Sequence, residues 1–161
     1  MREILFKAKR IDNGEWIEGS LIDLDIDSGY GYIVQPYKKA SILPINFLIT
    51  DRMKLVDPKT LSQFTGLCDK NGKRIWENDI LMCHGNSEDL VKVAFGEFGV
   101  RNIETGSIVD KVIGWYYEVV PTDAISRCEP FCWSMPLTED YIDRCEMEVV
   151  DRPELLQEVP E

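Results

Sequence analysis

The chain has 161 residues, a formal net charge of −11, and 44% hydrophobic and 29% charged residues. This balance is typical of a folded globular protein and excludes an intrinsically disordered chain. The first seven residues contain only three consecutive apolar residues, too few for a signal peptide, and no later stretch is apolar enough to span a membrane. We therefore expect a cytoplasmic protein with no membrane partner.

The negative charge is concentrated in the last third of the chain. Residues 118–161 hold twelve acidic and three basic residues, a net charge of −9, whereas residues 1–117 have a net charge of −2. An acidic segment repels the phosphate backbone of nucleic acids, so nucleic-acid binding by the last third is disfavoured. The nearly neutral first two thirds are not excluded by this argument.

The N-terminal segment predicts three β-strands. Residues 4–9 alternate between apolar and polar side chains, and residues 16–22 form the returning strand. Between them, Asp12-Asn13-Gly14 suits the positive φ of a hairpin turn. Residues 30–34 are the third strand. Residues 40–55 fit neither the strand nor the helix period and contain Pro44, so we expect extended chain there.

A helical turn is predicted at Asp57 and Pro58. Aspartate is a favoured N-cap, and proline is favoured at the first helical position. We place a boundary here, between an N-terminal β subdomain of residues 1–56 and a C-terminal barrel-like β subdomain of residues 57–161. The alternative is that the whole chain folds as one compact unit.

Residues 63–81 carry the clearest turn signals of the chain. Asn71-Gly72 predicts a type I′ hairpin turn. Asn78-Asp79 predicts a second bend, and residues 80–83 then alternate as a strand.

The remaining chain predicts further strands at residues 115–120 and 145–150, and a hairpin of residues 90–95 and 100–103 around a Gly96–Gly99 turn. Pro153 begins a short C-terminal helix. Short strands separated by tight turns predict a mainly β fold with minor α content, built as small antiparallel barrels or sandwiches.

Three blocks of the sequence resemble the YopX family of phage and prophage proteins. The N-terminal block combines residues 1–8 with 16–21, and the C-terminal block is Pro153-Glu154-Leu155-Leu156. The central block reads Thr65-Gly66-Leu67, Asp69-Lys70-Asn71-Gly72-Lys73 and Ile75-Trp76-Glu77-Asn78-Asp79-Ile80. The resemblance implies a protein in the cytoplasm of a bacterial host, without an established activity. We interpret its central residues as structural, namely Gly66, Asp69, Asn71, Gly72, Ile75, Trp76, Glu77 and Asp79.

The cysteines and the single histidine do not predict a metal or nucleophilic site. Five cysteines at irregular spacing indicate reduced thiols rather than a disulfide framework. Cys128 and Cys132 are spaced more widely than a zinc knuckle, and Cys83 and His84, if adjacent on a strand, point to opposite faces. No segment has the local signature of a nucleophilic cysteine. We expect no catalytic residue, no metal and no cofactor.

Two polar features allow both a functional and a structural interpretation. Glu77 and Asp79 could act as paired carboxylates, but aspartate in a bend commonly accepts hydrogen bonds from nearby backbone. The basic tip at residues 69–74, with Trp76 beside it, could grip phosphates and stack a base, or it could be a solvated hairpin. We favour the structural interpretation of both.

Aromatic clusters are the candidates for a protein interface, although core packing would explain them equally well. Their residues are Trp115, Tyr116, Phe131 and Trp133. The leading interpretation is a non-enzymatic protein-interaction module that self-associates. The alternatives are an acidic inhibitor or mimic that binds a basic nucleic-acid-binding protein, and a small β-barrel that binds nucleic acid through the Lys70–Trp76 hairpin.

Overall fold

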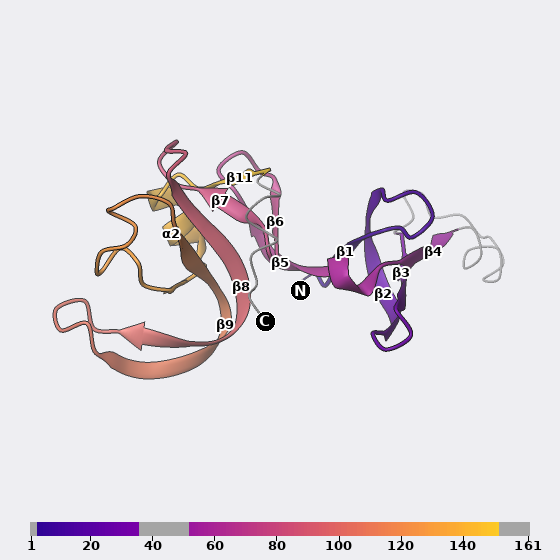
Figure 1. Cartoon of the computed structure of the whole chain (residues 1–161), viewed down its shortest axis with the longest axis horizontal. Helices are drawn as coiled ribbons and strands as arrows, with labels where there is room; N and C mark the ends of the chain where they lie inside the picture. The colour runs from indigo at the N-terminus through magenta and orange to yellow at the C-terminus, as the bar shows by residue number, and fades with distance from the viewer. Residues whose placement is uncertain (1–2, 36–51, 152–161) are drawn as a thin grey trace. The chain divides into compact units, whose positions relative to one another are not determined.

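The computed structural model describes residues 3–35 and 52–151. The chain divides into two compact units, Met1–Gly66 and Leu67–Glu161, which Figure 1 shows in indigo to magenta and in magenta to yellow. The boundary predicted from the sequence lies earlier, between residues 56 and 57.

The first unit is built on an antiparallel sheet. Its strands follow the order β4-β3-β2-β1-β5. Their bounds are β1 (Phe6–Lys9), β2 (Trp16–Asp25), β3 (Tyr30–Val34), β4 (Met53–Val56) and β5 (Ser62–Cys68). The last two residues of β5 belong to the second unit. The predicted hairpin of β1 and β2 is confirmed, with Ala8 opposite Ile17 and the turn residue Gly14 at φ 72°.

Alternating side chains of this sheet form the core of the first unit. Ala8, Ile17, Ile33 and Val56 are buried together, which removes their apolar surface from water. The predicted helical turn is confirmed as the 3-10 helix η1 (Pro58–Thr60), where the Asp57 side chain accepts a hydrogen bond from the Lys59 nitrogen. Most of the segment expected to be extended, residues 40–55, lies outside the described residues.

The second unit contains a five-stranded antiparallel sheet in the order β10-β9-β8-β7-β11. The strands are β7 (Ile80–Met82), β8 (Asp89–Arg101), β9 (Ile108–Pro121), β10 (Met135–Pro136) and β11 (Glu148–Val150). The short β6 (Arg74–Trp76) lies beside β5. Neither sheet closes into a barrel, so the predicted mainly β class is confirmed in its sandwich-like form.

The hairpin predicted around residues 96–99 is wrong. β8 runs unbroken through these glycines, and the chain reverses only at residues 102–107. Gly96 lies opposite Gly114, and two facing residues without side chains let the paired strands curve rather than reverse (Figure 1). Asn102 forms the true turn, because its Oδ1 accepts hydrogen bonds from the nitrogens of Glu104 and Thr105.

The turn signals at residues 71 and 78 have different outcomes. A type I′ turn needs positive φ at two consecutive residues, but only Gly72, at φ 78°, meets this requirement. The type I′ prediction is therefore wrong, and the tip is a longer loop that ends on a left-handed glycine. The bend at Asn78 is confirmed with φ 66°, and Asp79 Oδ2 accepts a 2.8 Å hydrogen bond from the Trp76 nitrogen.

The helix α2 (Glu139–Arg144) is not predicted by the sequence pattern. Thr138 caps its start by accepting a hydrogen bond from the Tyr141 nitrogen. The predicted strand at residues 145–150 begins only at Glu148, and the predicted C-terminal helix lies outside the described residues. Within residues 3–35 and 52–151, no helix has the length and apolar character that crossing a membrane requires.

Candidate functional site

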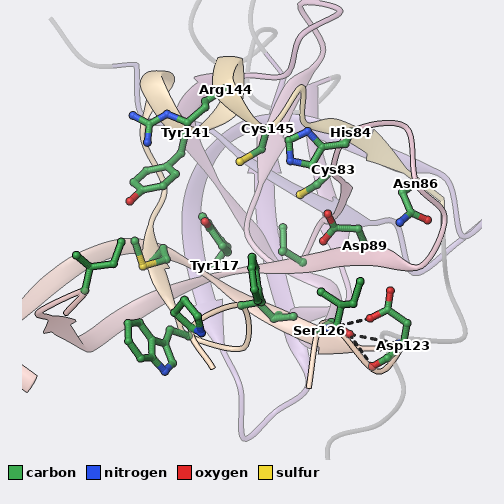
Figure 2. Close-up of a pocket in the computed structure, with 18 of the residues that line it drawn as sticks. Cys83, His84, Asn86, Asp89, Tyr117, Asp123, Ser126, Tyr141, Arg144 and Cys145 are labelled. Atoms are coloured by element: carbon green, nitrogen blue, oxygen red, sulfur yellow. Dashed lines mark hydrogen bonds between the residues drawn. The ribbon is translucent and has the colours of Figure 1, made fainter. Parts of the chain in front are cut away.

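The second unit contains a cleft of about 460 Å³ with mostly apolar walls (Figure 2). Side chains from the paired strands β8 and β9 form its floor, α2 and the residue that follows it form one wall, and the segment between β9 and β10 forms another. Its lining residues are Cys83, His84, Asn86, Asp89, Val91, Arg101, Ile103, Tyr117, Val119, Asp123, Ile125, Ser126, Pro130, Phe131, Trp133, Met135, Tyr141, Arg144 and Cys145.

Strand register explains why the floor is apolar. Val91 lies opposite Val119, and Val93 lies opposite Tyr117, so these alternating residues share one face of the sheet. Tyr117 belongs to the core cluster of the unit, and Val119 packs against that cluster. The floor of the cleft is therefore an extension of the core that no described element covers.

The wall after β9 is shaped by a local hydrogen-bonded turn. Asp123 Oδ1 accepts a 2.7 Å hydrogen bond from the Ser126 nitrogen, and the Ser126 hydroxyl oxygen accepts one from the Asp123 nitrogen. The hydrogen bonds from Ser126 hold the pKa of the Asp123 carboxyl below its usual value. Asp123 is therefore ionised at neutral pH and already engaged with its own turn.

The Asp89 side chain lines the cleft, and no described residue forms a hydrogen bond or ion pair with its carboxylate. It begins β8 and is half-buried. Burial raises the pKa of its carboxyl, His84 acts in the opposite direction, and Asp123 adds to the rise. None of the described residues donates a hydrogen bond to its side-chain oxygens, so no hydrogen bond offsets its partial desolvation.

Both thiols of the cleft are held in the neutral form. Burial, assisted by the charge of Asp89, raises the pKa of Cys83 to about 12. Burial also raises the pKa of Cys145. A thiol reacts and binds metal as the thiolate, so neither cysteine is activated for nucleophilic chemistry.

Cys83 and His84 do not alternate as strand residues. β7 ends at Met82, and His84 has φ 54°, so both side chains line the same cleft. The expectation that they point to opposite faces is wrong because the chain leaves the strand before them.

Glu77 and Asp79 do not line this cleft. In the part of the chain that the structure describes, no three His, Cys, Asp or Glu side chains are grouped as a metal site.

A second feature of this unit is the projecting half of the β8–β9 hairpin. The outer edge of β8 pairs with β7 only from Leu90 to Lys92, and the outer edge of β9 pairs with β10 only at two residues. The far halves of both strands, which curve away at the lower left of Figure 1, therefore have no other strand beside them among the described residues. Unpaired strand edges of this kind can pair with another chain.

One face of the projecting hairpin is apolar and exposed. Phe95 is 51% exposed and Ile113 is 75% exposed. Phe95 lies opposite Trp115 and makes an edge contact with it at 4.9 Å between ring centroids. Trp115 packs against the core cluster, so the apolar core face continues outward along the hairpin. The Glu97–Lys111 ion pair of 2.9 Å follows on the same face.

The predicted interface residues fall in different surroundings. Trp115 links the core to the hairpin, and Tyr116 stacks on Phe98 at 5.1 Å between centroids on the opposite face. Phe131 and Trp133 both line the cleft, Phe131 at its exposed rim and Trp133 almost completely buried. The four aromatic residues thus do not form one patch.

The predicted structural residues lie mainly in and around the loop between β5 and β6. Ile75 and Asp69 are buried, and Trp76 is only 4% exposed. A ring so deeply buried offers no face to a nucleic-acid base, and Lys70 pairs with Glu148 at 3.1 Å. These two facts remove the stacking surface and part of the positive charge that nucleic-acid binding by this hairpin requires.

Sequence reasoning missed the two polar groups that the cleft brings together. Asp89 and Tyr117 are separated by most of the long hairpin, and neither belongs to a recognisable motif. Their shared location depends on the pairing of β8 with β9, which the wrong turn at Gly96–Gly99 concealed.

The fold and cleft define a mainly β protein with a ligand-sized apolar cavity and neutral thiols. A family model described as YopX protein matches residues 5–126. The chain therefore belongs to the YopX family, as the sequence blocks had indicated. A comparison with curated proteins gave no match.

Proposed function

We propose that this YopX-family chain is a non-enzymatic protein-interaction module of a phage or prophage, that it acts in the cytoplasm of a bacterial host, and that it self-associates. The proposal rests on the β8–β9 hairpin. One face of its far half is apolar and exposed, and the outer edges of both strands there have no partner strand among the described residues. The neutral state of Cys83 and Cys145 supports a non-enzymatic role, because an activated thiol would be ionised near neutral pH.

The partner favoured for the hairpin is a second copy of the chain. Phe95 and Ile113 sit beside strand edges whose hydrogen-bonding groups have no partner strand in the described residues. Pairing with the same hairpin of another copy would cover both the apolar face and an edge at once, as in other two-fold symmetric contacts.

Size-exclusion chromatography with light scattering tests this proposal. At tens of micromolar, the 18.5 kDa chain is expected to elute with the mass of a dimer or larger assembly. Ile113→Glu places a charge on the apolar face and should weaken association by roughly tenfold or more. A strict monomer at these concentrations would contradict self-association.

Ile22→Glu is the matched control for that variant. Ile22 is 61% exposed and lies in the first unit, away from the hairpin in sequence. Its replacement introduces the same charge at a similar exposed isoleucine. Equal effects of the two substitutions would assign self-association to general surface hydrophobicity rather than to the hairpin.

A further inference from the structure

The direction of the backbone groups defines what the outer edge of β8 offers to another strand. The Val93 nitrogen donates a 3.0 Å hydrogen bond to the Asp79 carbonyl oxygen, and the Val93 carbonyl oxygen accepts one of 2.9 Å from the Asn78 nitrogen. Both groups of Val93 therefore point away from β9. Because this direction alternates along a strand, every second residue from 95 to 101 presents its N–H and C=O groups on the same outer edge. No other described strand pairs with β8 there.

Two-fold symmetry restricts the registers in which such an edge can pair with the same edge of a second copy. In an antiparallel pair, facing residues point to the same side of the sheet, and hydrogen-bonded and non-hydrogen-bonded pairs alternate. A two-fold axis converts the pair of residue i with residue j into the pair of j with i, so both pairs must be of the same kind. A residue therefore faces either itself or a residue an even number of positions away.

One of these registers matches opposite charges along β8. With Gly99 facing Gly99 of the second copy, Glu97 faces Arg101 of the second copy, and the axis repeats this pair. Both side chains are exposed. Glu97 uses Oε1 for its ion pair with Lys111, and Arg101 uses one guanidinium nitrogen for the Gly106 carbonyl oxygen. Each side chain thus keeps polar atoms for a second partner, and opposite charges that face each other stabilise paired strands.

The same register also brings apolar residues together. Phe98 faces Val100 of the second copy, which is 37% exposed in the single chain. Phe95, which is 51% exposed, reaches the turn of the second copy in which Ile103 is 78% exposed. The other registers of this edge lose the charge match. With residue 97 at the axis, Glu97 faces itself, and with residue 98 at the axis, Glu97 faces a glycine.

The outer edge of β9 has no register of this quality. Its charged residues Asp110 and Lys111 are adjacent, so their side chains point to opposite faces of the sheet. In a two-fold pair they can never face each other, and each would face either itself or an uncharged residue of β9. A lysine on an exposed edge also discourages strand pairing. Charge complementarity therefore selects the β8 edge.

We propose that two copies of the chain associate by antiparallel pairing of their β8 edges about a two-fold axis at Gly99, held by two reciprocal ion pairs between Glu97 and Arg101. The proposal rests on the proposed self-association and adds to it the edge, the register and the residues that specify the partner. The joined sheet has the strand order β9-β8-β8-β9 and leaves the β9 edges at its outside.

Charge reversal tests the proposed register, with the dimer dissociation constant measured by analytical ultracentrifugation of the full chain. Glu97→Arg and Arg101→Glu each place like charges opposite each other at both ion pairs and should weaken association at least about tenfold. In a mixture of the two variants, the reversed side chains face each other at one pair and the native side chains face each other at the other. The mixture should therefore form a mixed dimer with the affinity of the unmodified chain restored to within about threefold. The double variant that carries both substitutions should likewise associate with itself.

Asp110→Arg is the matched control. It changes the net charge by the same amount as Glu97→Arg, but on the exposed edge region of β9, and should leave the dissociation constant within about twofold of its original value. Retained dispersion of the amide spectrum shows that each variant is folded. Restored association in the mixture would show independently that both single variants keep the native hairpin.

The outcomes separate this proposal from the proposed function. If the unmodified chain associates and the single reversals do not weaken it, or if neither the mixture nor the double variant recovers affinity, the register is wrong while self-association stands. An effect of Asp110→Arg equal to that of Glu97→Arg would likewise overturn the choice of the β8 edge. A strictly monomeric unmodified chain would overturn both proposals.

Discussion

The side chain of Asp69 accepts a 2.9 Å hydrogen bond on Oδ2 from the backbone nitrogen of Val149, which lies 80 residues later. Its Oδ1 accepts bonds of 2.9 Å from the nitrogens of Asn71 and Lys73. One buried carboxylate therefore shapes the loop between β5 and β6 and ties it to β11. This arrangement gives the family motif a structural reason for an aspartate at this position.

Asp69→Asn is expected to lower the free energy of unfolding by about 2–4 kcal/mol. An amide has only one acceptor oxygen, so at least one of the three backbone N–H groups loses its partner, and an unsatisfied buried donor is costly. Urea unfolding of the variant measures the loss. Asp143→Asn, on the exposed surface of α2, is the control and should change stability by less than about 0.5 kcal/mol. Equal stability of both variants would contradict the role of Asp69.

Gly19→Ala should destabilise the protein by about 3 kcal/mol or more. A Cβ atom at residue 19 would lie 2.1 Å from the Val34 carbonyl oxygen, and backbone in a sheet can relieve such a clash only by moving. Gly114→Ala is the matched control, because a Cβ atom there meets nothing within 4 Å. The control should be neutral or more stable by roughly 0.5–1 kcal/mol, since alanine loses less backbone entropy than glycine on folding. Thermal unfolding of the two variants distinguishes them, and similar midpoints would contradict the close approach at Gly19.

Asp89→Asn is expected to be more stable than the unmodified chain at neutral pH. The pKa of Asp89 is raised in the folded state by burial. Its contribution therefore favours folding below the unfolded-state pKa of about 3.9 and is lost as the pH rises through the folded-state value. The advantage of the asparagine variant should grow with pH across this window and then level off. Urea unfolding from pH 4 to pH 8 measures it, and a pH-independent difference would contradict the burial of the Asp89 charge.

Four of the five cysteines should differ clearly in their rate of reaction with iodoacetamide at pH 8. Cys68, Cys128 and Cys132 are exposed and should be alkylated in the native protein. Cys83 should react only after unfolding, because with its pKa raised to about 12 only about one molecule in ten thousand carries the thiolate at this pH. Mass spectrometry of digested samples identifies the modified residues. Rapid native alkylation of Cys83 would contradict its neutral, buried state.

The local sequence determined the features that depend on near neighbours. The β1–β2 hairpin follows from alternation and from Gly14, the η1 cap follows from Asp57 and Pro58, and the left-handed bend follows from Asn78. In each case the conformation is selected by the backbone preferences of a few adjacent residues. The blocks that resemble YopX proteins likewise indicated the family.

Only the tertiary structure decided the long β8–β9 hairpin and the cleft. Gly96 and Gly99 have the local preferences of turn residues, but pairing of β8 with β9 along its whole length outweighs those preferences. The placement of Asp89 and Tyr117 on one face of the sheet follows from that pairing, and the capped turn at Asp123 adds a wall of the cleft. No short window of sequence contains these contacts. Contacts between distant residues therefore determine the position of the candidate site. Their energies depend on strand register and burial rather than on the residues adjacent in the sequence.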